Sequence, residues 1–126
     1  MKRIETAGAP AAIGPYSQGI IAGGLLYTAG QIGIDPATAK LVEGGIAAET
    51  EQVLANLRAI LVAAGVDFSA VVRSTIYLTD LAHFQKVNGI YERCLDGERP
   101  ARSTVGAAAL PLGAAILIDM TAAVEG

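Results

Sequence analysis

The sequence predicts an α/β fold, in which a mixed sheet carries two helices on one face in the order βββαβαββ. Three features indicate it: a helical repeat of apolar residues from 46 to 64, a β-branched run from 71 to 79, and an alternating pattern from 114 to 124. The length of 126 residues fits one domain, which we expect to span residues 1–126.

Turns divide the chain before residue 46 into short strands. Gly23-Gly24 separates two apolar runs, 19–22 and 25–28, which is typical of a β-hairpin. A second turn is expected at 35–38, where Asp and Pro begin the segment. Three strands are therefore expected to precede the first helix.

An amphipathic helix is expected over residues 46–64, and Gly65 supplies its stop. Its apolar face comprises Ile46, Thr50, Val53, Leu57, Ile60, Leu61 and Ala64. Its polar residues fall largely elsewhere: Glu49, Glu51, Gln52, Asn56 and Arg58. The helix is followed by the β-branched strand 71–79.

Asp80 can cap a second helix, expected over residues 81–95. The apolar stripe of this helix comprises Leu81, Phe84, Val87, Tyr91 and Leu95. Asn88 lies on the same stripe, so its amide must find a partner or cost stability. Two further strands, 101–107 and 114–124, are expected to be joined around residues 110–113.

The last strand predicts a sheet with two different faces. Ile116, Ile118 and Met120 point one way, toward the helices. The opposite side is semi-apolar although it includes one carboxylate, and it is formed by Ala115, Leu117, Asp119 and Thr121. Charged residues make up 17% of the chain, against about 25% in typical soluble domains. We therefore expect this second face to be covered by further copies of the chain.

Composition excludes several functions. The net charge of −3 and a pI near 5.0 argue against a nucleic-acid surface. The single Cys94 and the single His83 exclude a disulfide framework and a Cys-rich or multi-His metal site. They are expected to be an inert packed thiol and a surface histidine. The uncharged stretch 6–34 is broken by prolines and glycines, so we expect no membrane span and a cytoplasmic protein.

Arg102 and Asp119 stand out among the charged residues, because each lies in an apolar strand. The planar fork of Arg102 could hold the carboxylate of a ligand, or Arg102 and Asp119 could simply pair with each other or with other charges. Asn88 could likewise serve a ligand or make a structural hydrogen bond to a nearby loop. These alternatives stay open on the residues alone.

Two glycine-containing segments supply further candidates. Residues 12–18 are expected to form a compact turn that places the hydroxyls of Tyr16 and Ser17 beside flexible backbone. Gly30 ends a strand where a ligand can approach the main chain closely. Residues 12–18 could serve as a turn alone; otherwise Tyr16, Ser17 and Gly30 are candidate binding residues.

Five segments in order resemble the reactive intermediate deaminase family, also called Rid or YjgF. The matching residues are 13–18 (IGPYSQ), 30–32 (GQI), Val87-Asn88 with Tyr91, 100–103 (PARS), and Leu110-Pro111 with the apolar-acidic strand around Asp119. The resemblance implies a chorismate-mutase-like subunit that assembles as a homotrimer with clefts between subunits. It also implies hydrolysis of 2-imino acids and their enamine tautomers, such as 2-aminoacrylate, to 2-oxo acids and ammonia, without metal or cofactor.

Carried over by position, the resemblance assigns roles to the candidates. Arg102 would hold the substrate carboxylate. Tyr16, Gly30 and Asn88 would line the cleft, and Thr104 would contribute its backbone. Asp119 stands where many members have a Glu that positions the attacking water, and Thr104 stands where many have Cys.

The exchange of Glu for Asp at position 119 keeps a second interpretation open. Asp is one methylene shorter, and a displacement of about 1 Å can cost roughly 100-fold in rate. The alternative is a non-catalytic module on the same trimer that binds small carboxylates or another protein.

Overall fold

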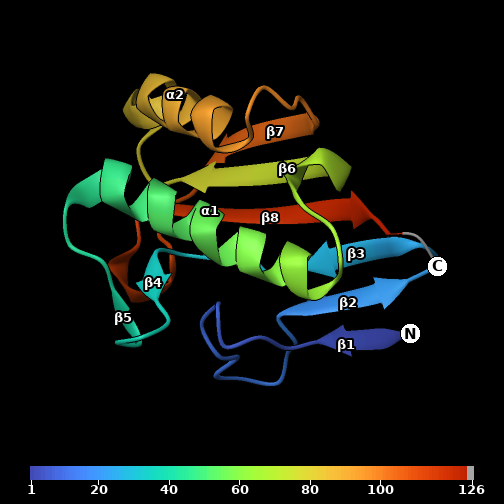
Figure 1. Cartoon of the computed structure of the whole chain (residues 1–126). Coiled ribbons are helices and arrows are strands. Elements are labelled where there is room, and N and C mark those ends of the chain that lie inside the picture. The colour runs from blue at the N-terminus through green and yellow to red at the C-terminus, as the bar shows by residue number, and fades with distance from the viewer. Residues whose placement is uncertain (125–126) are drawn as a thin grey trace.

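The computed structural model describes residues 1–124 and contains a six-stranded mixed sheet with two α-helices over one face (Figure 1). The strands lie in the order β1 (Lys2–Ile4), β2 (Gly19–Ala22), β3 (Leu25–Thr28), β8 (Ile116–Ala123), β6 (Val71–Leu78) and β7 (Ala101–Gly106). Among the strands of this sheet in residues 1–124, only β6 and β7 pair in parallel. The last two residues of the expected domain lie outside the described part.

The predicted order of elements is confirmed, with one addition. A two-stranded ribbon, β4 (Ile34–Asp35) and β5 (Lys40–Leu41), stands between β3 and helix α1 (Gly45–Ala63). The predicted hairpin is β2–β3, with Gly23 and Gly24 both at positive φ. No helix in residues 1–124 is both long and apolar enough to cross a membrane.

Two polar residues of α1 are buried, where the sequence pattern placed them off the apolar face. Glu49 and Asn56 are 6% and 0% exposed. Asn56 donates to the carbonyl oxygens of Ile32 and Ile34, at 3.2 and 2.9 Å. Glu49 accepts from the backbone N–H of Ala115 at 2.8 Å. The predicted position of Glu49 and Asn56 off the buried face is wrong, because each side chain forms hydrogen bonds with distant backbone groups that compensate its burial.

The second helical segment is not continuous. A 3₁₀ turn, η2 (Leu81–His83), precedes α2 (Phe84–Cys94), and Asp80 caps the turn by accepting from the backbone N–H of Ala82 at 2.9 Å. Leu81 and Phe84 are 54% and 39% exposed, so they do not share the buried stripe. Its buried members are Val87, Ile90, Tyr91 and Leu95.

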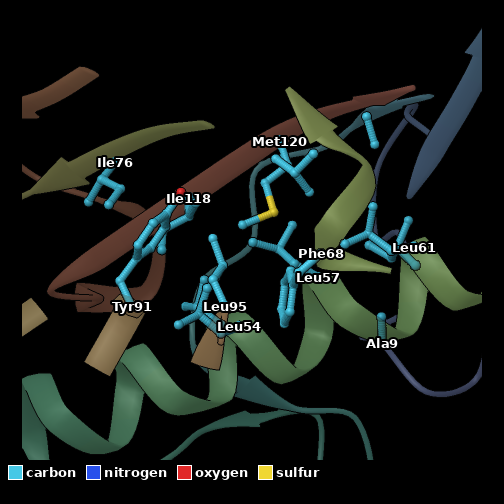
Figure 2. Close-up of a cluster of buried hydrophobic side chains, with 14 of the residues drawn as sticks. Ala9, Leu54, Leu57, Leu61, Phe68, Ile76, Tyr91, Leu95, Ile118 and Met120 are labelled. Atoms are coloured by element: carbon cyan, nitrogen blue, oxygen red, sulfur yellow. The ribbon is translucent and has the colours of Figure 1, made fainter. Parts of the chain in front are cut away.

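The core lies between the helices and the sheet (Figure 2). Leu54, Leu57 and Leu61 of α1 project toward β8, where Ile118 and Met120 meet them (Figure 2). The predicted inward direction of Ile116, Ile118 and Met120 is confirmed, because all three are fully buried.

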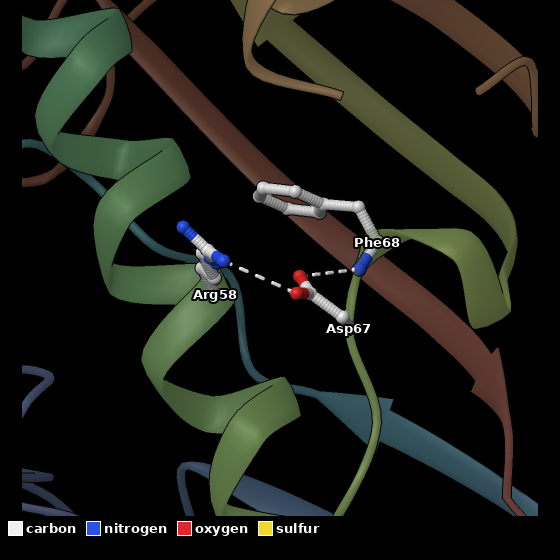
Figure 3. Close-up of polar contacts among 3 residues, drawn as sticks. All are labelled: Arg58, Asp67 and Phe68. Atoms are coloured by element: carbon white, nitrogen blue, oxygen red, sulfur yellow. Dashed lines mark hydrogen bonds and ion pairs between the residues drawn. The ribbon is translucent and has the colours of Figure 1, made fainter. Parts of the chain in front are cut away.

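A small polar cluster joins α1 to the strand that follows (Figure 3). Asp67 accepts from the backbone N–H of Phe68 at 2.8 Å and from Arg58 Nη2 at 3.2 Å. The backbone hydrogen bond lowers the pKa of Asp67. Phe68 begins the turn η1 (Phe68–Ala70) and enters the core.

Candidate functional site

Arg102 lies on the helix-bearing side of the sheet, at the edge strand β7. It is paired with Ser74 of β6, which is paired in turn with Met120 of β8. Directly paired residues point to the same face. Because Met120 packs beneath the helices, Arg102 also points toward them.

The guanidinium of Arg102 is held by α2. It donates to Asn88 Oδ1 at 2.6 Å, and its Cζ lies 5.1 Å from the ring centre of Tyr91 and 5.6 Å from that of Phe84. Asn88 thus serves Arg102 rather than the nearby loop weighed in the sequence analysis. The contacts fix the plane of the guanidinium and leave further N–H donors for another acceptor.

No protein carboxylate neutralises Arg102 among residues 1–124. The four ion pairs formed there involve other arginines. Arg102 is half-buried and lines a cavity of about 340 Å³ with Glu92 and Glu98, but Glu92 pairs with Arg99, at 3.7 Å. A half-buried, oriented arginine without an internal counter-ion is suited to an external anion.

The ring of Tyr91 packs against the guanidinium of Arg102. Burial raises the pKa of Tyr91, while its hydrogen bond with Ser74 and the charge of Arg102 oppose that rise. The phenol therefore stays neutral, and its ring offers an uncharged face to the guanidinium.

Thr104 follows Arg102 on the same side of β7, because it pairs with the buried Ile76. Its Oγ1 is buried and has no hydrogen-bond partner in the described residues. An unsatisfied buried hydroxyl costs about 1–3 kcal/mol. A ligand or a second copy that reaches this hydroxyl would remove that cost.

Asp119 lies on the opposite, uncovered face of the sheet. It is paired with Thr75, which is paired with Ser103. Burial raises the pKa of the Asp119 carboxyl, and the charge of Arg73 partly opposes the rise. Arg73 itself is held by a hydrogen bond to Ser103 Oγ at 3.0 Å.

A cavity of about 550 Å³ opens over Asp119. It is lined by Tyr16, Ala29, Gly30, Tyr77, Leu110, Pro111, Leu117 and Asp119. A Cβ at Gly30 would lie only 2.6 Å from Leu117 Cδ2, so any larger residue would displace this wall. Tyr16 and Gly30 therefore line the same cavity as Asp119, whereas Ser17 is half-buried and is not among the lining residues.

The loop that carries Tyr16 is fixed by Gln18, whose anchoring role the sequence analysis missed. The Gln18 amide donates to the carbonyl oxygens of Ala9 and Pro10, and its Oε1 accepts from the backbone N–H of Thr6 at 2.7 Å. Gln18 is 4% exposed. Its signal in sequence would be a lone amide within an apolar, proline-containing loop.

The candidates form two groups on opposite faces of one chain. Arg102, Asn88 and Thr104 lie at the β7 edge beneath the helices, while Asp119 lies with Tyr16 and Gly30 on the uncovered face. The suggested pairing of Arg102 with Asp119 is therefore wrong, because their rows in the sheet point in opposite directions. In residues 1–124, no three or more His, Cys, Asp or Glu side chains gather into a possible metal site.

The fold and these two groups define a small α/β protein with an oriented arginine at a sheet edge. A sequence profile described as "Endoribonuclease L-PSP" matches residues 6–124. The chain belongs to this family, the Rid/YjgF family, as the motif resemblance indicated.

Similar proteins agree over almost the whole chain. Protein DfrA of Myxococcus xanthus is 50% identical, covering 96% of this chain and 94% of that protein. The human 2-iminobutanoate/2-iminopropanoate deaminase is 47% identical, covering 94% and 87%. The solved structure of the Rid-family protein YyfA from Yersinia pestis has a TM-score of 0.95 at 47% identity, covering 98% of each chain.

Proposed function

We propose that this protein hydrolyses reactive 2-imino acids and their enamine tautomers to 2-oxo acids and ammonia. The observation that carries the proposal is the oriented Arg102 guanidinium, which no carboxylate in residues 1–124 neutralises. The similarity to a 2-iminobutanoate/2-iminopropanoate deaminase supports the same reaction. Small 2-imino acids carry the carboxylate that such an arginine binds through two parallel hydrogen bonds.

The complete site forms between two copies of the chain. Arg102 and Asp119 point away from each other within one copy, so one copy must present its β7 edge to the uncovered face of the next. This contact joins two different surfaces, and such contacts close into a ring when the rotation between neighbouring copies closes. A homotrimer with three shared clefts is the closed ring that the family resemblance implies.

The chemistry then needs only orientation and one water. Arg102 holds the substrate carboxylate, while Asn88 keeps the guanidinium in place and Thr104 lines the cleft with its backbone. Tyr16 and Gly30 shape the wall across from them. These contacts place the imine carbon close to the water that Asp119 holds.

Hydrolysis proceeds through a tetrahedral carbinolamine. The water oxygen bonds to the imine carbon as the C=N π electrons move to the nitrogen, and the water proton passes through Asp119 to that nitrogen, which becomes an NH2 group. The hydroxyl proton then passes by the same route to the NH2 group, the C–N bond breaks as the C=O bond forms, and ammonia leaves with the 2-oxo acid. Burial raises the pKa of Asp119, which brings the carboxyl closer to the range where it can both accept and return a proton.

The alternative is a non-catalytic module that binds small carboxylates or another protein on the same trimer. Its specific support is Asp119 itself, whose side chain reaches one methylene less far toward the water than Glu would. Arg102 would then hold an anion that undergoes no reaction.

An assay in which a dehydratase releases 2-aminoacrylate or its four-carbon homologue distinguishes these two functions. We expect the wild-type protein to accelerate formation of ammonia and 2-oxo acid well above spontaneous hydrolysis. Calorimetric titration with 2-oxobutyrate runs in parallel. Binding of 2-oxobutyrate without acceleration would favour the module, and absence of both would exclude an anion site at Arg102.

Subunit mixing tests the shared cleft. Arg102→Ala and Asp119→Asn should each lose most of the activity when tested alone. After equal amounts are unfolded and refolded together, about a quarter of the clefts should recover both groups by random assembly of neighbours. Recovery near that fraction supports a site built from two copies. Mixed oligomers without any recovery would contradict it.

A further inference from the structure

One tyrosine in the cavity over Asp119 has no role in the proposed mechanism. Among residues 1–124, the polar side chains that line this cavity are those of Tyr16, Tyr77 and Asp119. Tyr16 belongs to a loop and is 53% exposed, whereas Tyr77 is half-buried in β6. Tyr77 is therefore the polar neighbour of Asp119 that regular secondary structure holds in place.

The strand register brings Tyr77 close to Asp119. Strands β6 and β8 are antiparallel, with Thr75 opposite Asp119 and Tyr77 opposite Leu117. Residues two apart on a strand share a face, so Tyr77 and Asp119 are diagonal neighbours on the uncovered face of the sheet. Such neighbours are about 7–8 Å apart, which is within the reach of an aromatic side chain. The phenol and the carboxyl therefore enter one cavity from adjacent strands.

The hydroxyl of Tyr77 is free to serve a ligand. Among the side-chain hydrogen bonds of residues 1–124, the tyrosine hydroxyl that takes part is that of Tyr91, with Ser74. Burial raises the pKa of the Asp119 carboxyl and the charge of Arg73 opposes the rise, without a hydrogen bond from Tyr77. A phenol and a carboxyl that share a cavity without bonding each other can both contact one small molecule between them.

The other side of Asp119 offers backbone rather than side-chain donors. Gln31 exchanges two backbone hydrogen bonds with Ile118, at 2.9 and 3.1 Å, which holds the 29–31 segment along β8. This segment lines the cavity with Ala29 and Gly30, neither of which has a polar side chain. A side-chain donor fixed beside Asp119 must therefore come from β6, where Tyr77 stands.

We infer that Tyr77 is a further catalytic residue, whose O–H group donates a hydrogen bond to the oxygen of the water that Asp119 holds. The inference rests on the proposed deaminase function. The water proton leaves through Asp119 while Tyr77 keeps its own proton. The hydrogen bond persists as this oxygen becomes the hydroxyl of the carbinolamine and then the carbonyl oxygen of the 2-oxo acid. Negative charge builds on the oxygen when that hydroxyl gives up its proton, and a fixed donor stabilises it.

Tyr77→Phe tests this role, because it removes the hydroxyl and keeps the ring. With an imine released by a dehydratase, we expect kcat to fall by about 100-fold, the lower end of the effect of removing one donor to a reacting oxyanion. KM should change by less than about twofold, since the bond strengthens only in the transition state. An unchanged kcat would overturn this inference alone, while a wild-type protein without any acceleration would reject the proposed function as well.

Tyr27 provides a matched control. It lies on the same uncovered face, opposite Thr121, is 48% exposed and is not among the residues that line the cavity. Tyr27→Phe should leave kcat and KM within about twofold of the wild type. Equal losses of kcat in the two variants, together with altered sedimentation, would mean that these hydroxyls act through assembly, and the inference would be wrong.

A double variant separates a shared water from a role in packing. Residues that hold the same reacting atom act as a unit, so the effects of removing them are not additive. Tyr77→Phe combined with Asp119→Asn should therefore stay within about threefold of the kcat of Asp119→Asn alone. A hydroxyl that only supports the wall of the cavity would multiply the two losses. A further fall of about 100-fold in the double variant would thus contradict the shared water.

Discussion

Buried polar groups differ in their hydrogen bonding between two regions of the molecule. One region is the core between α1 and the sheet. The other comprises β7 and the uncovered face of the sheet. In the core, Asn56 and Glu49 find every needed partner within the chain. Around the candidate site, Thr104 Oγ1 is buried without a partner, and Arg102 lacks a carboxylate in residues 1–124. Polar groups that folding leaves uncompensated are the ones available to a group from outside the chain.

The largest effect should come from Arg102→Ala, which removes the anion-binding group. We expect kcat/KM for imine hydrolysis to fall by about 1,000-fold, as when a preorganised donor is removed from a reacting oxyanion. The free energy of unfolding should change by less than about 1 kcal/mol, because water can replace Arg102 at the half-buried Asn88. Arg93→Ala, which removes an exposed ion pair with Glu51, is the control and should change neither quantity strongly.

Asp119→Asn should have the next largest effect on activity. The amide cannot accept the proton of the attacking water, so kcat should fall by about 100-fold with a smaller change in KM. Asp119→Glu should keep or raise activity on small imines. A complete loss in the Glu variant would show that Asp119 is adapted to another task.

Asn56→Ala should lower the free energy of unfolding more than it lowers the rate of imine hydrolysis. The change leaves the carbonyls of Ile32 and Ile34 unsatisfied, so we expect a loss of about 2 kcal/mol in the free energy of unfolding. Urea unfolding followed by circular dichroism measures it. Gln52→Ala, which removes only a donor to Asn56 Oδ1, should cost much less; equal losses would mean that the two carbonyls do not matter.

The smallest expected effect is a pH dependence of the free energy of unfolding that arises from the titration of Asp119. Burial raises the pKa of Asp119 in the folded chain above its ordinary value, with Arg73 opposing. Between these two values the folded state holds more protons than the unfolded state, so the free energy of unfolding decreases as pH rises. Asp119→Asn should lack this decrease. The urea unfolding midpoints of the wild type and the variant, measured between about pH 3.5 and 6.5, test this expectation. A steeper fall of the midpoint with pH in the variant would contradict it.

Local patterns were sufficient for much of the fold. The helical repeat predicts α1 within one residue at each end, and alternation in the last strand identifies which residues of β8 face the core. Such features depend on residues a few positions apart. The same is true of the β2–β3 hairpin, which two glycines at positive φ determine.

Interactions between distant segments decided the rest. The burial of Asn56 and Glu49 depends on backbone groups 22 to 66 residues away, which no local period reveals. The motifs singled out Arg102 and Asp119, but only the register of β6 with β7 and β8 shows that they point to opposite faces. The sequence alone therefore determined most of the elements and the candidate site residues. Only the tertiary structure decided which of them meet, because pairing across a sheet depends on strand register rather than on spacing along the chain.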